Sequence, residues 1–352
     1  MAYANGWAAI NLQMPARVPR IEFDAERHWE LVTTVTGIDV NFASVPSRQQ
    51  QAQKAFMQAW NYDLQLMPLI GENELDAKRT KMGHGTYLAG GGDFDNNIHS
   101  PFCDPEEVLS FDPRETYGSK NESELIARFN AHYQTQCREY PDLVNTTGTY
   151  VTLFSGLIAI FGWDLFLMAG GLAPERLGAV AQRYAEWMQP YYNALAASDA
   201  PLIYSHDDIV WTTGAVFHPE WYRKYIFPNY QKYYAPLIEA GKKVIFIADG
   251  NYTQFVDDIA ATGAHGFFFE PLTDLKYIVE HYGQTHIIIG NVDTRVLLTG
   301  TKIQIQQEVE RCLNLGKKCP GYFIGVTNMI PSNTPVENAL YYNEFYEKLC
   351  WR

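Results

Sequence analysis

The sequence has few cysteines and lacks any long apolar run. Its five cysteines among 352 residues are odd in number and form no CxxC pair, which argues against a disulfide framework and favours reduced thiols in a cytoplasmic protein. The N-terminus has no basic segment followed by an apolar one, and no window approaches about 18 uninterrupted apolar residues. These absences argue against secretion and against a membrane span.

Positive charge is also scarce, since 27 Lys and Arg residues face 40 Asp and Glu residues and the net charge is −13. A broad basic surface for phosphate backbones is therefore not expected, and nucleic acid is excluded as a predicted partner. No Pro/Ser-rich linker, low-complexity tract or charge block marks a domain boundary. We expect a single domain over residues 1–352, with a divergent N-terminal part at about 1–145.

The C-terminal half repeats one unit, in which a short apolar run ends in polar residues and a helical stretch follows. The runs are 202–208, 244–250, 266–271, 286–293 and 322–328. Runs of this kind are typical of strands buried on both faces of a parallel sheet. Strand–helix alternation fits a barrel or a doubly wound sheet, and the pattern alone does not choose between them.

The N-terminal half is less regular. Helix-like stretches are expected around 24–36 and 47–65 and at 122–139, and a Gly-rich loop occupies 88–97. This loop does not follow a strand and open a helix, as a phosphate-binding loop would. It is expected to be a surface loop, or a lid whose glycines at 90–92 let it move.

The chain resembles the uroporphyrinogen decarboxylase superfamily, throughout 206–301 and well over roughly 145–345. The resemblance is carried by Asp208, Gly214, Pro219, Tyr222, Asp249-Gly250-Asn251, Gly263, Glu270-Pro271, Gly283, Gly290-Asn291-Val292-Asp293 and Thr334-Pro335-x-Glu337-Asn338. It implies an α/β fold of the (β/α)₈ TIM-barrel type, which decides between the two architectures.

The branches of this superfamily differ in their chemistry. The decarboxylases carry an Arg-rich N-terminal motif that holds a polycarboxylated porphyrinogen, and Arg17, Arg20 and Arg27 do not reproduce it. The thiol methyltransferases bind zinc through His and Cys ligands, whose positions correspond here to Ile247, Asp249 and Asn328. The resemblance therefore implies the remaining branch, which demethylates a small methyl donor and methylates a corrinoid.

In that branch the methyl group moves to Co(I) of a cobalamin carried by a separate corrinoid protein, and methoxylated aromatic compounds are typical donors. The expected function is that of an O-demethylase methyltransferase component in anaerobic one-carbon metabolism. Demethylation of a methylamine or thioether is an alternative. A non-catalytic barrel that binds a small ligand or a corrinoid protein is another, and a homodimer is left open.

Barrel enzymes place their chemistry at the C-terminal ends of the strands. Cleaving an ether requires an acid for the departing oxygen, and Asp249 and Glu270 each follow a very apolar strand where desolvation raises a carboxyl pKa. Either could instead cap a helix or pair with a rim cation. With His206 they are the predicted catalytic residues. The predicted substrate-binding residues are Asp208, Asn251, Asn291, Asp293, Asn328, Tyr204, Trp211 and Phe268.

A metal site is left open by the sequence. Strand alternation puts His206 and Asp208 on one face and Asp207 on the other, so this pair and Asp249 or Glu270 could bind a divalent ion. A structural His–Asp hydrogen bond is the alternative. Aromatic residues are 14% of the chain, enough to sandwich an aromatic ether, although most are expected to be core packing.

Overall fold

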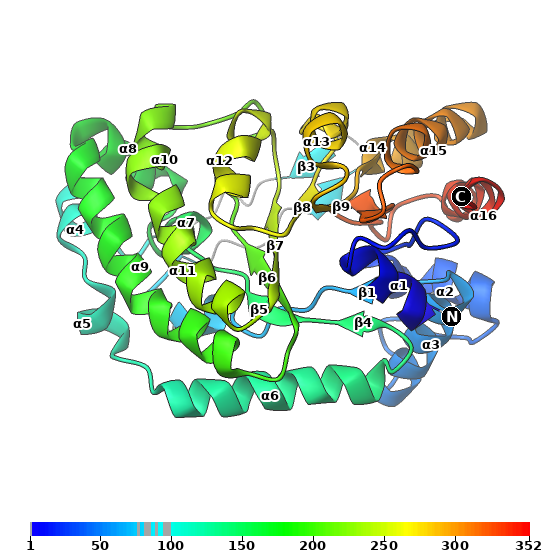
Figure 1. The fold of residues 1–352 in the computed structure, drawn as a ribbon, viewed down its shortest axis with the longest axis horizontal. Helices are drawn as coiled ribbons and strands as arrows, with labels where there is room; N and C mark the ends of the chain where they lie inside the picture. The colour runs from blue at the N-terminus through cyan, green and yellow to red at the C-terminus, as the bar shows by residue number, and fades with distance from the viewer. Residues whose placement is uncertain (1, 76–77, 81–85, 89–90, 94–99) are drawn as a thin grey trace.

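The computed structural model describes residues 2–75, 78–80, 86–88, 91–93 and 100–352 (Figure 1). Its main sheet is parallel throughout, with the order β11-β9-β8-β7-β6-β5. The strands are β5 (Thr147–Thr149), β6 (Leu202–His206), β7 (Lys243–Ala248), β8 (Gly266–Phe269), β9 (Ile287–Ile289) and β11 (Tyr322–Phe323). Short strands β10 (Val292–Asp293) and β12 (Val326–Thr327) pair beyond β9 and β11.

The sheet closes on itself through the N-terminal part of the chain. Arg20 bridges Ile324, just after β11, and also Tyr62, which precedes β1 (Leu64–Gln65). β1 pairs with β4 (Val144–Asn145), which leads into β5. The Arg20 segment, β1 and the continuous β4–β5 segment thus join the other five strands in a closed ring, and the predicted (β/α)₈ barrel is confirmed.

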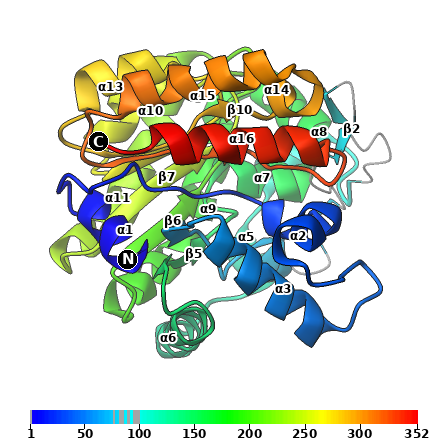
Figure 2. The same cartoon turned by 90° about the vertical axis from the view of Figure 1, so that its right-hand side faces the viewer.

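A helix follows each position of the ring. In chain order these are α3 (Pro46–Ala59), α6 (Glu122–Glu139), α9 (Pro174–Ala197), α11 (Phe227–Glu239), α12 (Val256–Ala261), α13 (Leu275–Tyr282), α15 (Lys302–Gly316) and α16 (Val336–Leu349). Figure 2 shows α15 and α16 side by side on one flank and α6 on the opposite one. The helix expected at 122–139 is confirmed with the same bounds.

Further elements occupy the connections. They are α1 (Ala2–Ile10), η1 (Ala25–Arg27), α2 (Trp29–Thr36), η2 (Glu72–Leu75), α4 (Pro105–Ser110), α5 (Pro113–Tyr117), α7 (Phe154–Phe161), α8 (Trp163–Leu172), α10 (Pro219–Tyr225), η3 (Thr253–Phe255) and α14 (Thr294–Thr299). Within the Gly-rich loop, Gly91–Asp93 forms β3 and pairs antiparallel with β2 (Thr86–Leu88). Residues 89–90 and 94–97 lie outside the described residues, so the predicted lid remains a prediction.

Side chains alternate strictly between the barrel interior and the surrounding helices. On β6, Leu202 and Tyr204 belong to the inner core, whereas Ile203 belongs to the core between sheet and helices. Ile245 and Ile247 of β7 likewise face inward. The alternation continues past the strand ends, and it therefore decides which polar residues reach the barrel mouth.

Helix α1 packs under the inner core at the N-terminal side of the barrel. Its Ala9 and Ile10 are fully buried in that core, and a Cβ on Gly6 would lie 2.5 Å from the Asp63 carbonyl oxygen. Helix α1 therefore packs directly against the backbone at Asp63. Among the described residues no single helix has the length and apolar character of a membrane span, although the bent pair α7–α8 passes that test as a pair.

Candidate functional site

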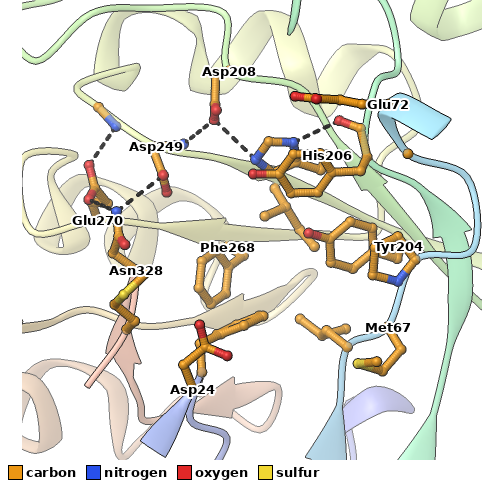
Figure 3. A pocket seen from close by; sticks show the side chains of 18 of the residues that line it. Asp24, Met67, Glu72, Tyr204, His206, Asp208, Asp249, Phe268, Glu270 and Asn328 are labelled. Atoms are coloured by element: carbon orange, nitrogen blue, oxygen red, sulfur yellow. Dashed lines mark hydrogen bonds and ion pairs between the residues drawn. The ribbon is translucent and has the colours of Figure 1, made fainter. Parts of the chain in front are cut away.

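A cavity of about 760 Å³ lies at the C-terminal ends of the strands, a size typical of small-molecule sites. Eight of the eleven predicted site residues line it. They are Tyr204, His206 and Asp208 from β6 and its continuation, Trp211 beyond them, Asp249 after β7, Phe268 and Glu270 at the end of β8, and Asn328 after β12. Figure 3 shows Asp208, Asp249 and Glu270 gathered on one side, with Asp24 facing them from another.

Asn328 joins the two carboxylates that the sequence singled out as acids. Its Nδ2 donates to Asp249 Oδ2 at 3.2 Å and to Glu270 Oε1 at 2.9 Å. Glu270 Oε2 also accepts from the backbone N–H of Gly250 at 2.7 Å. Asn328 adopts a positive φ of 84°, a conformation that Asn tolerates better than most residues. The turn after β12 thus aims this amide at both carboxylates.

The pKa of Asp249 is raised well above its ordinary value. Burial is the main cause, the negative charges of Glu270 and Asp208 add to it, and His206 opposes it. A carboxyl group in this position holds its proton at a pH where an exposed aspartate has lost it. Asp249 is therefore suited to donate a proton inside the cavity.

His206 is held as an imidazolium ion. Its Nδ1 lies 2.9 Å from the carbonyl oxygen of Tyr150, which can only accept, and its Nε2 lies 3.2 Å from Asp208 Oδ1. Both ring nitrogens therefore donate. Burial lowers the pKa of His206, but the charge of Asp208 and the hydrogen bond to it outweigh burial and raise the pKa to about 9. Asp208 Oδ1 also accepts from the Asp249 N–H at 2.8 Å.

Asp207 points away from the cavity, as alternation predicts. It is fully buried and accepts from the N–H groups of Phe154 and Ser155, at 2.9 and 2.6 Å, and from the hydroxyl of Tyr230 at 2.5 Å. These N–H groups belong to the first turn of α7, where a carboxylate is favoured by the helix dipole. Asp207 therefore anchors α7 to β6.

Three predicted substrate-binding residues lie outside the cavity lining. Asn251 accepts from Thr253 in the turn that opens η3. Asn291, which is 1% exposed, donates to the carbonyls of Glu270 and Thr273. Asp293 caps α14. Each is at a strand end, as predicted, but the hydrogen bonds of its side chain are made within the protein: in its own turn for Asn251, with the loop after β8 for Asn291 and with the first turn of α14 for Asp293.

Sequence reasoning missed the wall supplied by the N-terminal part of the chain. It comprises Phe23, Asp24, Arg27 and the stretch 66–73. The sequence signal for this wall is a short alternation of apolar and polar residues, with Ile21 and Phe23 in one segment and Leu64 and Leu66 in the other. These four side chains face the inner core. Tyr150 and Trp163 also line the cavity, although neither was among the predicted site residues.

Aromatic rings form much of the remaining wall. Tyr150 stacks on His206 with ring centroids 4.0 Å apart, and the Trp163 and Trp211 rings meet edge to face at 5.0 Å. Phe23 and Phe268 also meet edge to face at 5.0 Å. A wall rich in aromatic rings suits a flat or positively charged ligand.

The donor set gives no support for the metal half-site considered from the sequence. In the described part of the chain, no three His, Cys, Asp or Glu side chains are grouped so as to hold an ion. His206 and Asp208 face each other in a hydrogen-bonded ion pair. This is the structural His–Asp interaction that the sequence left as an alternative.

Comparisons with known proteins agree with this architecture. The solved structure of a methyltransferase from Methanosarcina mazei matches with a TM-score of 0.65 at 16% identity, covering 99% of this chain and 98% of that one. This match concerns the fold. Among curated proteins, a uroporphyrinogen decarboxylase of Carboxydothermus hydrogenoformans is 29% identical over 59% of this chain and 58% of its own length. One of Thermus thermophilus is 28% identical over 48% of each.

The chain therefore spans only about half the length of these curated relatives. The family described as uroporphyrinogen decarboxylase (URO-D) matches residues 142–349, which are more than half of the chain and contain most of the cavity's polar side. The chain belongs to the uroporphyrinogen decarboxylase family.

Proposed function

We propose that this protein is a methyltransferase that demethylates a small methoxylated aromatic compound and passes the methyl group to the Co(I) corrinoid of a partner protein. The observation that carries the proposal is the carboxyl of Asp249, which hydrogen-bonds to Asn328, lies beside Glu270 and has a pKa raised by burial, in a cavity with aromatic walls. An ether oxygen leaves readily only if it receives a proton as its bond to the methyl carbon breaks. The reduced corrinoid supplies the nucleophile that takes the methyl group.

In the proposed reaction, the residues of this chain hold the proton and donate it to the departing oxygen. As the methyl–oxygen bond breaks, its electron pair stays on the oxygen, which takes the proton of Asp249. Asp249 is left as a carboxylate and regains a proton from solvent. Asn328 fixes the orientation of Asp249 and Glu270, and the negative charge of Glu270 keeps the pKa of Asp249 raised. The ring faces enclose the aromatic donor and exclude water.

Porphyrinogen decarboxylation fits the site poorly. Among the three N-terminal arginines, Arg17 binds Asp63 at 2.7 Å and Arg20 is fully buried against Glu22. Only Arg27 lines the cavity, where Asp24 lies beside it. A polycarboxylated substrate needs several cations directed at it, and the described wall of this cavity does not offer them.

Thiols should not be acceptors. The positions that correspond to zinc ligands in the thiol methyltransferases carry Ile247, Asp249 and Asn328, which meet in the cavity but include no sulfur or imidazole ligand. Without a zinc-bound thiolate, a thiol remains a weak nucleophile at neutral pH. We expect no methyl transfer from methylcobalamin to coenzyme M or homocysteine, even with added zinc. Thioether formation above the protein-free rate, measured by mass spectrometry, would contradict this.

The function itself is tested with reduced cobalamin and a panel of donors. We expect the absorbance of Co(I) cobalamin to disappear when the protein is mixed with a methoxylated aromatic compound, and the matching phenol to form in equal amount. Methylamines and thioethers in the same panel test the alternative donors. If no donor methylates cobalamin, either free or on a corrinoid protein, the barrel is a binding protein and the proposal is wrong.

A further inference from the structure

The described wall of the cavity carries far more negative than positive groups. Its carboxylates are Asp24, Glu72, Asp208, Asp249 and Glu270, and its cationic side chains are Arg27 and His206. With every group ionised the excess is three negative charges (five minus two), and it is two if Asp249 holds a proton. Glu72 is offset by Arg79, which lies 2.5 Å away but outside the lining. The described wall is therefore negative in either state.

Both cations of this wall already face a carboxylate of the same wall. The Nε of Arg27 lies 3.5 Å from Asp24 Oδ1, and Nε2 of His206 lies 3.2 Å from Asp208 Oδ1. At either cation a ligand carboxylate would compete with a carboxylate of the wall, Asp24 at Arg27 and Asp208 at His206. It would also place another negative charge near Asp249 and Glu270, which like-charge repulsion opposes.

Two further features of the wall describe its ligand, and the first of them favours a cation. The side chains of Phe23, Tyr150, Trp163, Tyr204, Trp211 and Phe268 contribute to it, and the negative face of an aromatic ring attracts ammonium groups. In addition, the hydroxyl of Tyr204 has no hydrogen bond to any described residue, although only 3% of this residue is exposed. Figure 3 shows it directed into the cavity, toward Phe268. A buried hydroxyl of this kind is completed by a polar ligand.

We infer that the methyl donor carries a positive charge, so that it is a methoxylated aromatic ammonium compound and not a methoxylated aromatic carboxylate. That the donor carries a methoxy group rests on the proposed function. The charge preference is a property of the cavity, and it holds for binding whether or not methyl transfer follows.

The first test compares three ligands of the same size by titration calorimetry, namely 4-methoxybenzylamine, 4-methoxybenzyl alcohol and 4-methoxybenzoate at neutral pH. We expect the ammonium compound to bind about tenfold more tightly than the alcohol, a difference of about 1.4 kcal/mol. We expect the benzoate to bind at least about tenfold more weakly than the alcohol. The inference is wrong if the ammonium compound shows no binding, binds no better than the alcohol, or binds no better than the benzoate.

The second test removes one charge from the wall. Asp24 has φ 55° and its side chain makes no capping hydrogen bond, and Asn tolerates this left-handed conformation, so Asp24→Asn should fold. Because it also releases Arg27, we expect the ratio of ammonium to benzoate affinity to fall by about tenfold or more. Glu239→Gln, which removes an equal charge from the exposed end of α11, should leave the ratio unchanged. An unchanged ratio in folded Asp24→Asn would overturn the inference.

These measurements separate the two proposals. If binding follows the expected order but no donor methylates cobalamin, the charge preference stands and the methyltransferase proposal fails. If a methoxybenzoate is demethylated as efficiently as the ammonium compound, the methyltransferase proposal stands and the charge preference fails.

Discussion

Asp249→Asn should lower the turnover of a methoxylated donor by about 10²–10⁴-fold, which is the usual range for the loss of a general acid. The amide preserves the size of the side chain and can still bond to Asn328, which lies 3.2 Å from Asp249 Oδ2. It has no acidic proton to give to the departing oxygen. The measurement is the initial rate of phenol formation at saturating donor and corrinoid.

Asp293→Asn provides the matched control. Asp293 also follows a barrel strand, but it caps α14 and lies outside the cavity lining, and Asn caps a helix about as well as Asp. We expect nearly unchanged turnover in this variant. Near-normal turnover in a folded Asp249→Asn protein would remove Asp249 from the mechanism.

The pH dependence of the wild-type rate should also report the proton of Asp249. The pKa of Asp249 is raised by burial and by the charges of Glu270 and Asp208, and the acid form is the active one. Turnover should therefore be full below this raised pKa and fall as the pH rises through it. Asp249→Asn should lose this alkaline limb while keeping its low residual rate.

The polar side of the site was predictable because three neighbouring strands obey one simple rule. β6, β7 and β8 are short, mostly apolar strands, and alternation carries each of them to an inward polar residue, namely Asp208, Asp249 or Glu270. The same rule put Asp207 on the other face. Nothing in such a rule, however, says whether a strand-end residue bonds to a loop. Asn291 was assigned to the substrate for this reason, although it donates to the carbonyls of Glu270 and Thr273.

The opposite wall was not predictable from the pattern. The Arg20 segment and β1 enter the barrel through isolated bridges or two-residue pairings, which are too short to leave a periodic signal. Their place is fixed by long-range contacts, such as the hydrogen bond from the Ile21 N–H to the Ile324 carbonyl at 3.1 Å. Asp24 and Arg27 follow directly from this segment. The charge on that wall therefore becomes apparent only once the barrel closes.

Gly148→Ala should be the most damaging single-methyl change to the barrel. Gly148 of β5 pairs with Tyr204 of β6, and a Cβ at position 148 would lie 1.9 Å from the Tyr204 carbonyl oxygen. The obstacle is backbone in the middle of a parallel sheet, so it cannot turn aside as a flexible side chain could. We expect a loss of at least about 3 kcal/mol in the free energy of unfolding, at the upper end for overpacking. Urea denaturation at constant m-value measures it.

The matched control for this change is Gly171→Ala. Gly171 lies in α8, and a Cβ there would meet nothing within 4 Å, so we expect a change of no more than about 1 kcal/mol, toward greater stability, because alanine is the better helix former. Any Gly148→Ala protein that still folds must also shift β5 against β6. Because Tyr204 of β6 lines the cavity, the affinity of the Gly148→Ala protein for 4-methoxybenzylamine should fall as well. Equal stability of the two variants would show that the β5–β6 contact yields more easily than its backbone geometry implies.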